Sequence, residues 1–196
     1  MRIILSGGGT GGHINPALAI ARHIQSREPG SEILFCGGRG GLEEKLVPRE
    51  GFKLVTYPLK GLKRRLTPSG LAHNARALWQ AAQAAQAARR VVRDFAPDVV
   101  VGCGGYASYP VVRAAQRLKV PTAVLEVNAL PGVTTRALAK KADAVMICFP
   151  ESREYFPGGN VVHTGNPVRG EFLQVNREQA RRELNRDIID VFMLHE

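Results

Sequence analysis

Short apolar runs alternate with longer segments of helical periodicity along most of the chain. Strands are predicted where the runs are almost continuously apolar, at residues 2–6, 33–36, 53–57, 98–101, 122–125, 144–148 and 161–163. Helices are predicted between and after them, at residues 15–27, 43–50, 69–95, 111–118, 133–141 and 176–185. Continuously apolar strands are expected where helices cover both faces of a parallel sheet. The alternation predicts an α/β fold with a Rossmann-like, doubly wound parallel sheet and ligand sites at the carboxyl ends of its strands.

The composition is that of a folded protein. The 196 residues correspond to one domain or slightly more. Hydrophobic residues make up 44% and charged residues 22% of the chain, which argues against disorder. No apolar run reaches the roughly 20 residues of a membrane-spanning helix. Because Cys36, Cys103 and Cys148 are odd in number and widely spaced, neither a disulfide framework nor a zinc site is indicated, and a reduced, cytosolic protein is expected.

The last residues predict the start of a separate element. Residues 187–194 have the apolar character of an entering strand. A single strand without a partner sheet is only marginally stable. We therefore expect residues 1–185 to form one Rossmann-like domain and residues 186–196 to begin a second domain that these 196 residues do not contain.

The net charge of +10 is concentrated in one stretch. Between Glu50 and Asp94 there are nine bases and no acid. Such a stretch suits nucleic acid, anionic lipid or a phosphorylated substrate, but no nucleic-acid-binding signature accompanies it. Leu59 and the leucines after it alternate with bases, and an apolar stripe rimmed by bases is typical of contact with an anionic membrane. The residues predicted to make this contact are Lys60, Leu62, Lys63, Arg64, Arg65, Leu66 and Trp79. The simpler alternative is that the leucines belong to the core and the bases to a solvated face.

A glycine-rich turn, residues 7–13, follows the first predicted strand and leads into a helix. Its glycines allow a tight turn and a close approach to a ligand, and the free N–H groups of the next helix attract anions. Gly7, Gly9 and Gly12 also fit the G-x-G-x-x-G pattern of dinucleotide sites. The end of the second strand has no acid for a ribose, but Arg39 could hold a 2′-phosphate, so an NADP-dependent oxidoreductase domain is an alternative. A P-loop is disfavoured because His13 stands where its lysine is required.

Three more strand ends carry polar or glycine-rich segments. A second turn, residues 102–108, includes Gly104, Gly105, Tyr106 and Ser108. Two anion-binding turns on one edge of a sheet fit a diphosphate better than one turn. Asn128, after the fifth strand, suits a sugar or an amide, and Arg169, after the last, offers a planar fork for a phosphate.

Four motifs together resemble the MurG family of bacterial transferases. They are GGTGGHINP at residues 8–16, GGYxS at 104–108, ExNAxPG at 126–132 and NPVR at 166–169. These enzymes add N-acetylglucosamine to the undecaprenyl-diphosphate-linked N-acetylmuramoyl-pentapeptide of peptidoglycan synthesis. The four motifs occur in the order of the family and span most of the chain. The sequence departs from the family pattern at Tyr109, usually Gly, and at Val127, usually Gln.

The resemblance implies the N-terminal, acceptor-binding half of a GT-B glycosyltransferase. It also implies an inverting β-1,4 transfer from UDP-N-acetylglucosamine that uses no metal or other cofactor. By position, the UDP-sugar would be contacted by Thr10, Gly11, Gly12, Asn128 and Arg169. The acceptor diphosphate would be held by the first turn with Gly104, Gly105, Tyr106 and Ser108.

Two residues are candidates for the acid–base chemistry. His13 is the candidate general base, since an imidazole titrates near neutral pH and this turn faces the chemistry. The alternative is that His13 only hydrogen-bonds the loop or the diphosphate. Glu126 is the weaker candidate, and it could instead orient a partner.

The resemblance also implies a place and partners for the chain. The family docks on the cytoplasmic face of the plasma membrane, where its lipid-linked acceptor lies. Because the donor-binding domain lies beyond these 196 residues, we expect little transfer from them alone unless a separate donor-binding domain completes the cleft. Outside the enzymes, the alternative is a module that holds a polyprenyl-diphosphate sugar without acting on it.

Overall fold

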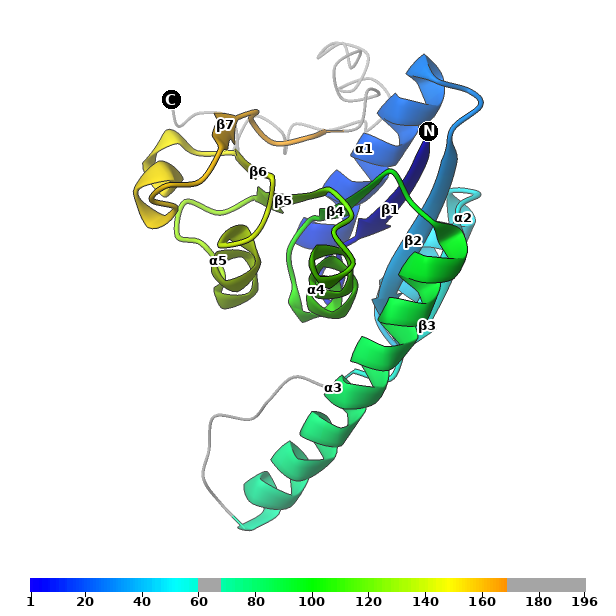
Figure 1. The fold of residues 1–196 in the computed structure, drawn as a ribbon, viewed down its shortest axis with the longest axis vertical. Helices are drawn as coiled ribbons and strands as arrows, with labels where there is room; N and C mark the ends of the chain where they lie inside the picture. The colour runs from blue at the N-terminus through cyan, green and yellow to red at the C-terminus, as the bar shows by residue number, and fades with distance from the viewer. Residues whose placement is uncertain (60–67, 169–196) are drawn as a thin grey trace, which may run out of the picture.

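The computed structural model describes residues 1–59 and 68–168, the second segment with side chains from residue 79 onward (Figure 1). Its centre is a seven-stranded parallel sheet in the order β3-β2-β1-β4-β5-β6-β7. The strands are β1 (Arg2–Ser6), β2 (Glu32–Gly38), β3 (Lys53–Tyr57), β4 (Val99–Gly102), β5 (Thr122–Glu126), β6 (Ala144–Ile147) and β7 (Val161–His163). The predicted Rossmann-like α/β fold is confirmed. The helix expected at residues 176–185 and the second domain expected from residue 186 lie outside the described residues.

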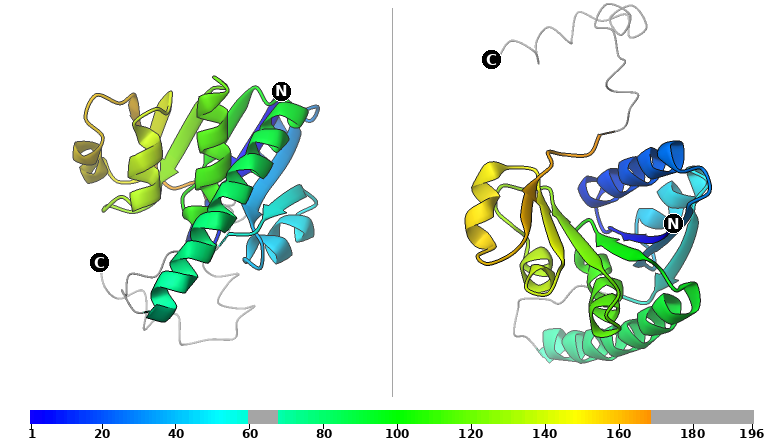
Figure 2. Two further views of the ribbon diagram at one scale, coloured as in Figure 1. Left: turned by 60° about the horizontal axis from the view of Figure 1, so that its bottom comes forward. Right: turned by 45° about the horizontal axis from the view of Figure 1, so that its top comes forward.

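Helices cover both faces of the sheet (Figure 2). They are α1 (Gly11–Arg27), α2 (Glu43–Arg49), α3 (Pro68–Phe95), α4 (Tyr109–Arg117) and α5 (Val133–Ala139), with 3₁₀ turns η1 (Tyr106–Ser108) and η2 (Pro150–Tyr155). Ile4 of β1 packs with α3, α4 and α5, whereas its neighbours Ile3 and Leu5 pack with α1 and α2. Alternate side chains of a strand point to opposite faces, so both faces of β1 must be apolar. This is why the strands read as continuous apolar runs.

The strand order reverses between β1 and β4. The chain leaves β1 toward β2 on one side and leaves β4 toward β5 on the other. In open parallel sheets, ligands bind in the crevice that such a reversal leaves at the carboxyl edge. The turns after β1 and β4 contain the two glycine clusters of the sequence, so the topology brings both clusters to this crevice.

Helix α1 begins four residues earlier than the periodicity predicted. The N–H groups of His13 and Ile14 donate to the carbonyl oxygen of Thr10, at 3.2 and 3.3 Å. Gly11 and Gly12 are therefore the first residues of the helix instead of part of a loop. Glycine has a low helix propensity, so the pattern alone places the start too late. The consequence is that the free N–H groups of the first helical turn lie within the glycine motif itself.

No helix in the described ranges has the length and apolar character needed to cross a bilayer. Leu59, the first leucine of the predicted membrane stripe, packs against the core on the α3 side of the sheet. For this leucine the structure supports the core alternative. The other residues of the stripe, from Lys60 to Leu66, lie outside the described residues.

Candidate active site

The two glycine turns touch each other at the carboxyl edge. A Cβ atom added to Gly105 would lie 2.3 Å from the carbonyl oxygen of Gly8. Gly104 and Gly105 have φ values of +93° and +74°, which other residues rarely adopt. Glycine is therefore required here by the backbone conformation and by the space. The structure brings the first and second motifs into direct contact.

His13 lies between the two turns. A Cβ atom on Gly104 would be 2.8 Å from Nδ1 of His13, so the imidazole packs directly on this glycine. Nδ1 is buried and has no hydrogen-bond partner among the described residues. The residue as a whole is half-buried, at the contact between the two turns. This is the position that a general base or a diphosphate-binding group requires.

Tyr106 belongs to the second turn, and its side chain packs over the first turn. Its ring lies against Gly9, whose Cβ atom would be 3.2 Å from Cε1, and against Gly38, whose Cβ atom would be 3.6 Å from Cε2. The side chain is 42% exposed, so one part of the ring faces solvent at the rim of the crevice. Ser108 is buried and donates its hydroxyl to the carbonyl oxygen of Gly105 at 2.9 Å. Ser108 therefore shapes the turn, and Tyr106 is the residue that is open to a ligand.

Glu126 holds the loop that follows β5. Its Oε1 accepts hydrogen bonds from the backbone N–H and the side-chain amide of Asn128, at 3.0 and 2.9 Å. Its Oε2 accepts one from the N–H of Gly132 at 3.0 Å. The carboxylate is 2% exposed and both oxygens are engaged. The geometry favours the orienting role for Glu126 over that of a base, because it fixes the exposed Asn128 at the rim.

The first motif also meets the fourth. A shallow cavity of about 240 Å³ is lined by Gly11, Gly12, Asn15, Pro16, Asn166, Pro167 and Val168. These segments are some 150 positions apart in the sequence, and the β7 connection brings them together. Thr10, at the start of α1, is exposed close by in the chain. Arg169 lies outside the described residues, directly after this cavity lining.

Glu43 is a residue of the site that sequence reasoning missed. It is 1% exposed, and its side chain fills the space between the turns after β1 and β2. Cβ atoms on Gly8 or Gly41 would lie 2.2 Å from a carboxylate oxygen, and one on Gly37 would lie 2.6 Å from Cγ. In the sequence, Glu43 is only the first residue of the helix predicted at residues 43–50. The signal that could have found it is the pair of glycine clusters, residues 7–9 and 37–41, at two neighbouring strand ends.

The position of Glu43 also bears on the dinucleotide alternative. In dinucleotide-binding folds, the ribose lies near the end of the second strand, beside the glycine turn. Here this space contains the Glu43 carboxylate, and Arg39 is exposed to solvent. The structure therefore disfavours an NADP site at this turn.

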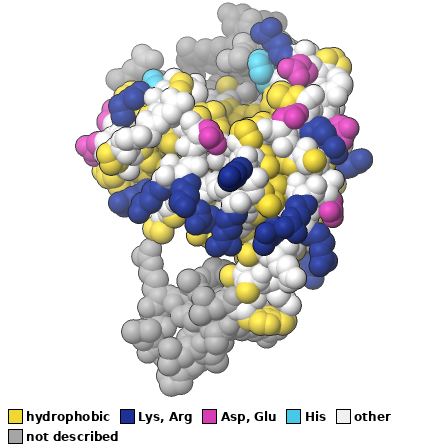
Figure 3. Space-filling model, in the orientation of Figure 1, with side chains coloured by type: hydrophobic (Ala, Val, Ile, Leu, Met, Phe, Trp, Pro, Cys, Tyr) yellow, Lys and Arg dark blue, Asp and Glu magenta, His cyan; other side chains and the backbone are white. Residues whose placement is uncertain are grey.

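A basic groove lies on the opposite side of the sheet from α1. It has a volume of about 150 Å³ between α3 and α4 and is lined by Arg89, Arg113 and Arg117 with Ala81, Ala85, Tyr109, Pro110 and Ala114. Figure 3 shows Lys and Arg side chains in a band across this side of the molecule. Trp79, on the same helix as Arg89, is 62% exposed. The groove combines positive charge with apolar surface.

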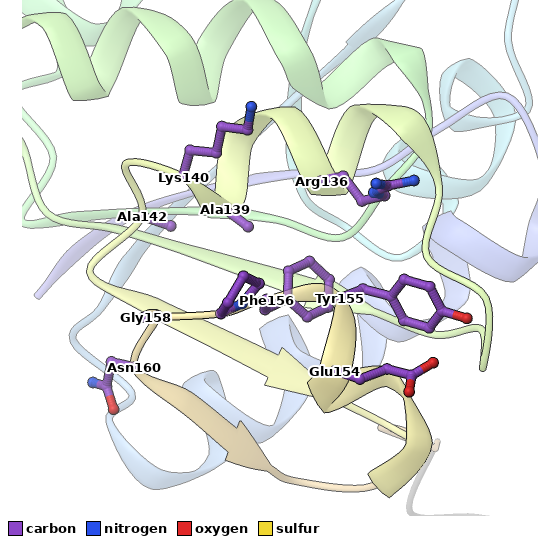
Figure 4. A pocket seen from close by; sticks show the side chains of 11 residues that line it. Arg136, Ala139, Lys140, Ala142, Glu154, Tyr155, Phe156, Gly158 and Asn160 are labelled. Carbon is purple, nitrogen blue, oxygen red and sulfur yellow. The ribbon is translucent and has the colours of Figure 1, made fainter.

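A cavity of about 550 Å³ lies between α5 and the connection from η2 to β7 (Figure 4). Arg136, Lys140 and Glu154 line it with Tyr155 and Phe156. The guanidinium carbon of Arg136 lies 6.0 Å from the centre of the Tyr155 ring. None of the four motifs contributes a residue to this cavity, so it is separate from the candidate site.

A parallel, Rossmann-like sheet with glycine turns at its point of reversal defines a class of nucleotide- and diphosphate-binding domains that includes the GT-B glycosyltransferases. The match to the solved structure of Acinetobacter baumannii MurG covers 90% of this chain and 50% of the MurG chain, with a TM-score of 0.71 and 27% sequence identity. A UDP-GlcNAc 2-epimerase from Neisseria meningitidis has the same fold, with a TM-score of 0.61 at 16% identity over 95% of this chain and 55% of its own.

The sequence comparisons give the family. The model described as the glycosyltransferase family 28 N-terminal domain matches residues 3–147. The chain belongs to this family. It is 49% identical, over 94% of its length, to the UDP-N-acetylglucosamine–N-acetylmuramyl-(pentapeptide) pyrophosphoryl-undecaprenol N-acetylglucosamine transferase of Acetivibrio thermocellus. It is 46% identical, over 85% of its length, to that of Lactococcus lactis subsp. cremoris. The chain spans about half the length of these curated relatives (49% and 46%), and the predicted resemblance is confirmed.

Proposed function

We propose that this chain is the acceptor-binding half of a transferase that moves N-acetylglucosamine from UDP-N-acetylglucosamine to N-acetylmuramyl-(pentapeptide) pyrophosphoryl-undecaprenol. Relatives of up to 49% identity are named for this reaction. The observation that carries the proposal is the contact between the two glycine turns, with His13 packed between them. A diphosphate needs several donors at one point, and two turns beside a helix N-terminus supply them.

Each part of the site has a role in this proposal. The free N–H groups at the start of α1 and the turn of Gly104 and Gly105 hold the acceptor diphosphate. Asn128, oriented by Glu126, binds the sugar. His13 takes the proton from the 4-hydroxyl of the acceptor. The oxygen of that hydroxyl forms a bond to the anomeric carbon of N-acetylglucosamine as the bond between this carbon and UDP breaks. Arg169 and a donor-binding half complete the contacts to the UDP-sugar.

Binding of the acceptor tests the proposal directly. The chain is titrated with undecaprenyl diphosphate, the lipid part of the acceptor, and, separately, with undecaprenyl monophosphate in the same detergent micelles. We expect at least about tenfold tighter binding of the diphosphate, because charge-assisted hydrogen bonds to the second phosphate are lost with the monophosphate. Equal affinity for both lipids would contradict the proposal.

A fusion tests the role of His13 in transfer. The chain is joined to the C-terminal half of the Acetivibrio thermocellus relative, and transfer from UDP-N-acetylglucosamine is measured. His13→Ala should lower the rate about 10²–10⁴-fold, the usual contribution of a general base. The matched control is His23→Ala, an exposed histidine on the same helix, which should leave the rate unchanged. A His13→Ala rate within threefold of the parent would leave the histidine only a structural or diphosphate-binding role. Binding without transfer by the parent fusion would favour the non-catalytic module.

Contact with the cytoplasmic face of the membrane is part of the same proposal. It is supported by the basic groove between α3 and α4 and by the exposed Trp79. Arginines beside apolar surface attract anionic headgroups, by about 1 kcal/mol for each base near the surface. Sedimentation with phosphatidylglycerol vesicles and with phosphatidylcholine vesicles tests it, and only the anionic vesicles should bind the chain.

A charge-matched pair of variants makes the membrane test specific. Changing Arg89, Arg113 and Arg117 to Gln should abolish sedimentation with the anionic vesicles. Changing the exposed Arg27, Lys45 and Arg49 to Gln removes the same charge from the α1 and α2 side and should change it little. Equal losses in both triple variants would mean that net charge, and not the groove, attracts the vesicles.

A further inference from the structure

Glu43 is a carboxylate buried behind the turns that follow β1 and β2. Its Oε1 accepts a hydrogen bond from the N–H of Gly38 at 2.9 Å, and its Oε2 accepts one from the N–H of Gly9 at 3.2 Å. Within the described part of the chain, no Lys, Arg or His forms an ion pair with it. Burying a carboxylate is costly unless it is paired or hydrogen-bonded. The two backbone donors of the turns are therefore what hold this charge.

The hydrogen bond to Gly9 fixes the peptide group between Gly8 and Gly9. A peptide group is planar, so the direction of its N–H sets the direction of its carbonyl. The N–H of Gly9 points to Glu43, and the carbonyl oxygen of Gly8 lies against Gly105. This peptide group thus spans the distance from Glu43 to the second glycine turn. Glu43 sets the spacing between the two turns.

The same carboxylate supports the surface under Tyr106. The ring of Tyr106 lies on Gly9 and Gly38. Glu43 accepts hydrogen bonds from the N–H groups of these same two residues. Gly9 lies in the turn after β1, and Gly38 is the last residue of the neighbouring strand β2. A shift of the carboxylate would therefore move both glycines under the ring. Tyr106 is the exposed residue of the second turn, so its placement at the rim depends on Glu43.

We propose that Glu43 is a positioning residue for the diphosphate of the acceptor. It touches no substrate and acts by holding Gly9 and Gly38, and through them the spacing of the two turns and the place of Tyr106. The inference rests on the proposed function, because the diphosphate is the ligand that the two turns would share.

Glu43→Gln tests this role. The glutamine amide has one acceptor oxygen and can accept a hydrogen bond from only one of the two N–H groups. The other glycine, Gly9 or Gly38, is then no longer held, while the side chain keeps its size. We expect affinity for N-acetylmuramyl-(pentapeptide) pyrophosphoryl-undecaprenol in micelles to fall at least about tenfold, the effect of losing one hydrogen bond to a charged group. Amide hydrogen exchange should rise at whichever of Gly9 and Gly38 loses its acceptor, while exchange in β1 and β4 stays slow.

Two controls on the same helix separate positioning from stability. Glu44→Gln removes the same charge from the exposed neighbour and should leave affinity and exchange unchanged. Val47→Ala removes buried apolar volume from α2, so it should lower the melting temperature without weakening acceptor binding below that temperature. Equal loss of affinity in Val47→Ala and Glu43→Gln would overturn the proposal.

The remaining outcomes are also decisive. If the parent chain binds the acceptor and folded Glu43→Gln binds it within twofold, the role of Glu43 fails and the proposed function stands. If the parent chain does not bind the acceptor, the proposed function fails, and the inference with it. If Glu43→Gln does not fold, Glu43→Asp carries the test, because it keeps the charge but is one methylene too short to reach both N–H groups. Parent-like affinity in Glu43→Asp would then overturn the proposal.

Discussion

Replacing Gly104 by alanine should disturb the candidate site through His13. At a φ value of +93°, a Cβ atom costs about 1–2 kcal/mol in backbone strain. The same atom would lie 2.8 Å from Nδ1 and 3.0 Å from Cε1 of His13. The imidazole must turn away from its rotamer, at a further cost of about 0.5–1.5 kcal/mol. We therefore expect Gly104→Ala to lower the free energy of unfolding by about 2–3 kcal/mol, or the melting temperature by about 4–10 °C.

The matched control for this variant is Gly40→Ala. Gly40 has a φ value of +79°, but no heavy atom lies within 4 Å of an added Cβ. Its alanine variant should show the backbone strain alone. Urea denaturation of both variants therefore isolates the contact with the imidazole as the difference, about 1 kcal/mol. Adding His13→Ala should remove this difference, because the double mutant has no ring to displace.

The same variants separate the effect on stability from the effect on binding. Gly104→Ala should weaken acceptor binding by about tenfold. This corresponds to a loss of about 1.4 kcal/mol of binding free energy when His13 and the second turn are displaced. Gly40→Ala should leave the affinity unchanged. The reasoning is refuted if both variants lose the same free energy of unfolding and Gly104→Ala binds the acceptor as the parent does, since His13 would then not depend on this glycine.

Two further predictions concern buried groups. Burial raises the pKa of Cys36 and Cys103 from 9.0 to about 12, so the folded state keeps both protons while the unfolded state loses them. The free energy of unfolding should fall as pH rises above 9, by about 1.4 kcal/mol per thiol between pH 8 and pH 10. In urea denaturation at the two pH values, Cys36→Ala and Cys103→Ala should each reduce this fall by the contribution of one thiol. A fall that is the same in the variants as in the parent would contradict the prediction. Glu126→Gln leaves one of the loop N–H groups without its acceptor and should cost about 1–3 kcal/mol of unfolding free energy, whereas the exposed Glu151→Gln should cost almost nothing.

The central strands β1, β2, β4 and β5 could be predicted because they are buried on both faces, and the edge strands β3 and β7 because they are short and rich in β-branched or aromatic residues. Residues 2–6, 53–57 and 161–163 were predicted with the bounds that the structure gives. The buried strands differ from helices by their short length and apolar continuity, which the sequence displays directly. The 3₁₀ turn η2 was not predicted, because its residues are polar and too few to show a period. Its Ser152 donates hydrogen bonds to the carbonyl oxygens of Asn128 and Ala129, a long-range contact that no local pattern reveals.

The grouping of the site residues followed from topology. Residues that come after parallel strands lie on one edge of the sheet, so the glycine turns, Tyr106 and Asn128 could be placed on one rim without knowing any distance. Which side chains face a ligand could not be predicted in this way. Ser108 was expected to bind the acceptor diphosphate, and Glu126 to be a weaker candidate base or an orienting residue. In the structure their polar atoms hold the backbone of their own loops. A polar residue near a glycine turn can bind a ligand or its own loop, and only the folded structure distinguishes the two.

Glu43 shows how a side chain outside the motif can decide between two ligands for the same glycine pattern. The spacing of Gly7, Gly9 and Gly12 fits a dinucleotide fold as well as a transferase. A dinucleotide site needs open space at the end of the second strand and an acid at its rim for the ribose. Here the acid comes five residues after Gly38 and turns inward, so it occupies that space and accepts hydrogen bonds from the N–H groups of Gly9 in the first turn and Gly38 at the end of β2. On the β4 side, Gly104 and Gly105 lie against Gly8 and His13, and in the proposed function these two turns together hold the acceptor diphosphate. The ligand preference of a glycine-rich turn is therefore set in part by what fills the space behind it.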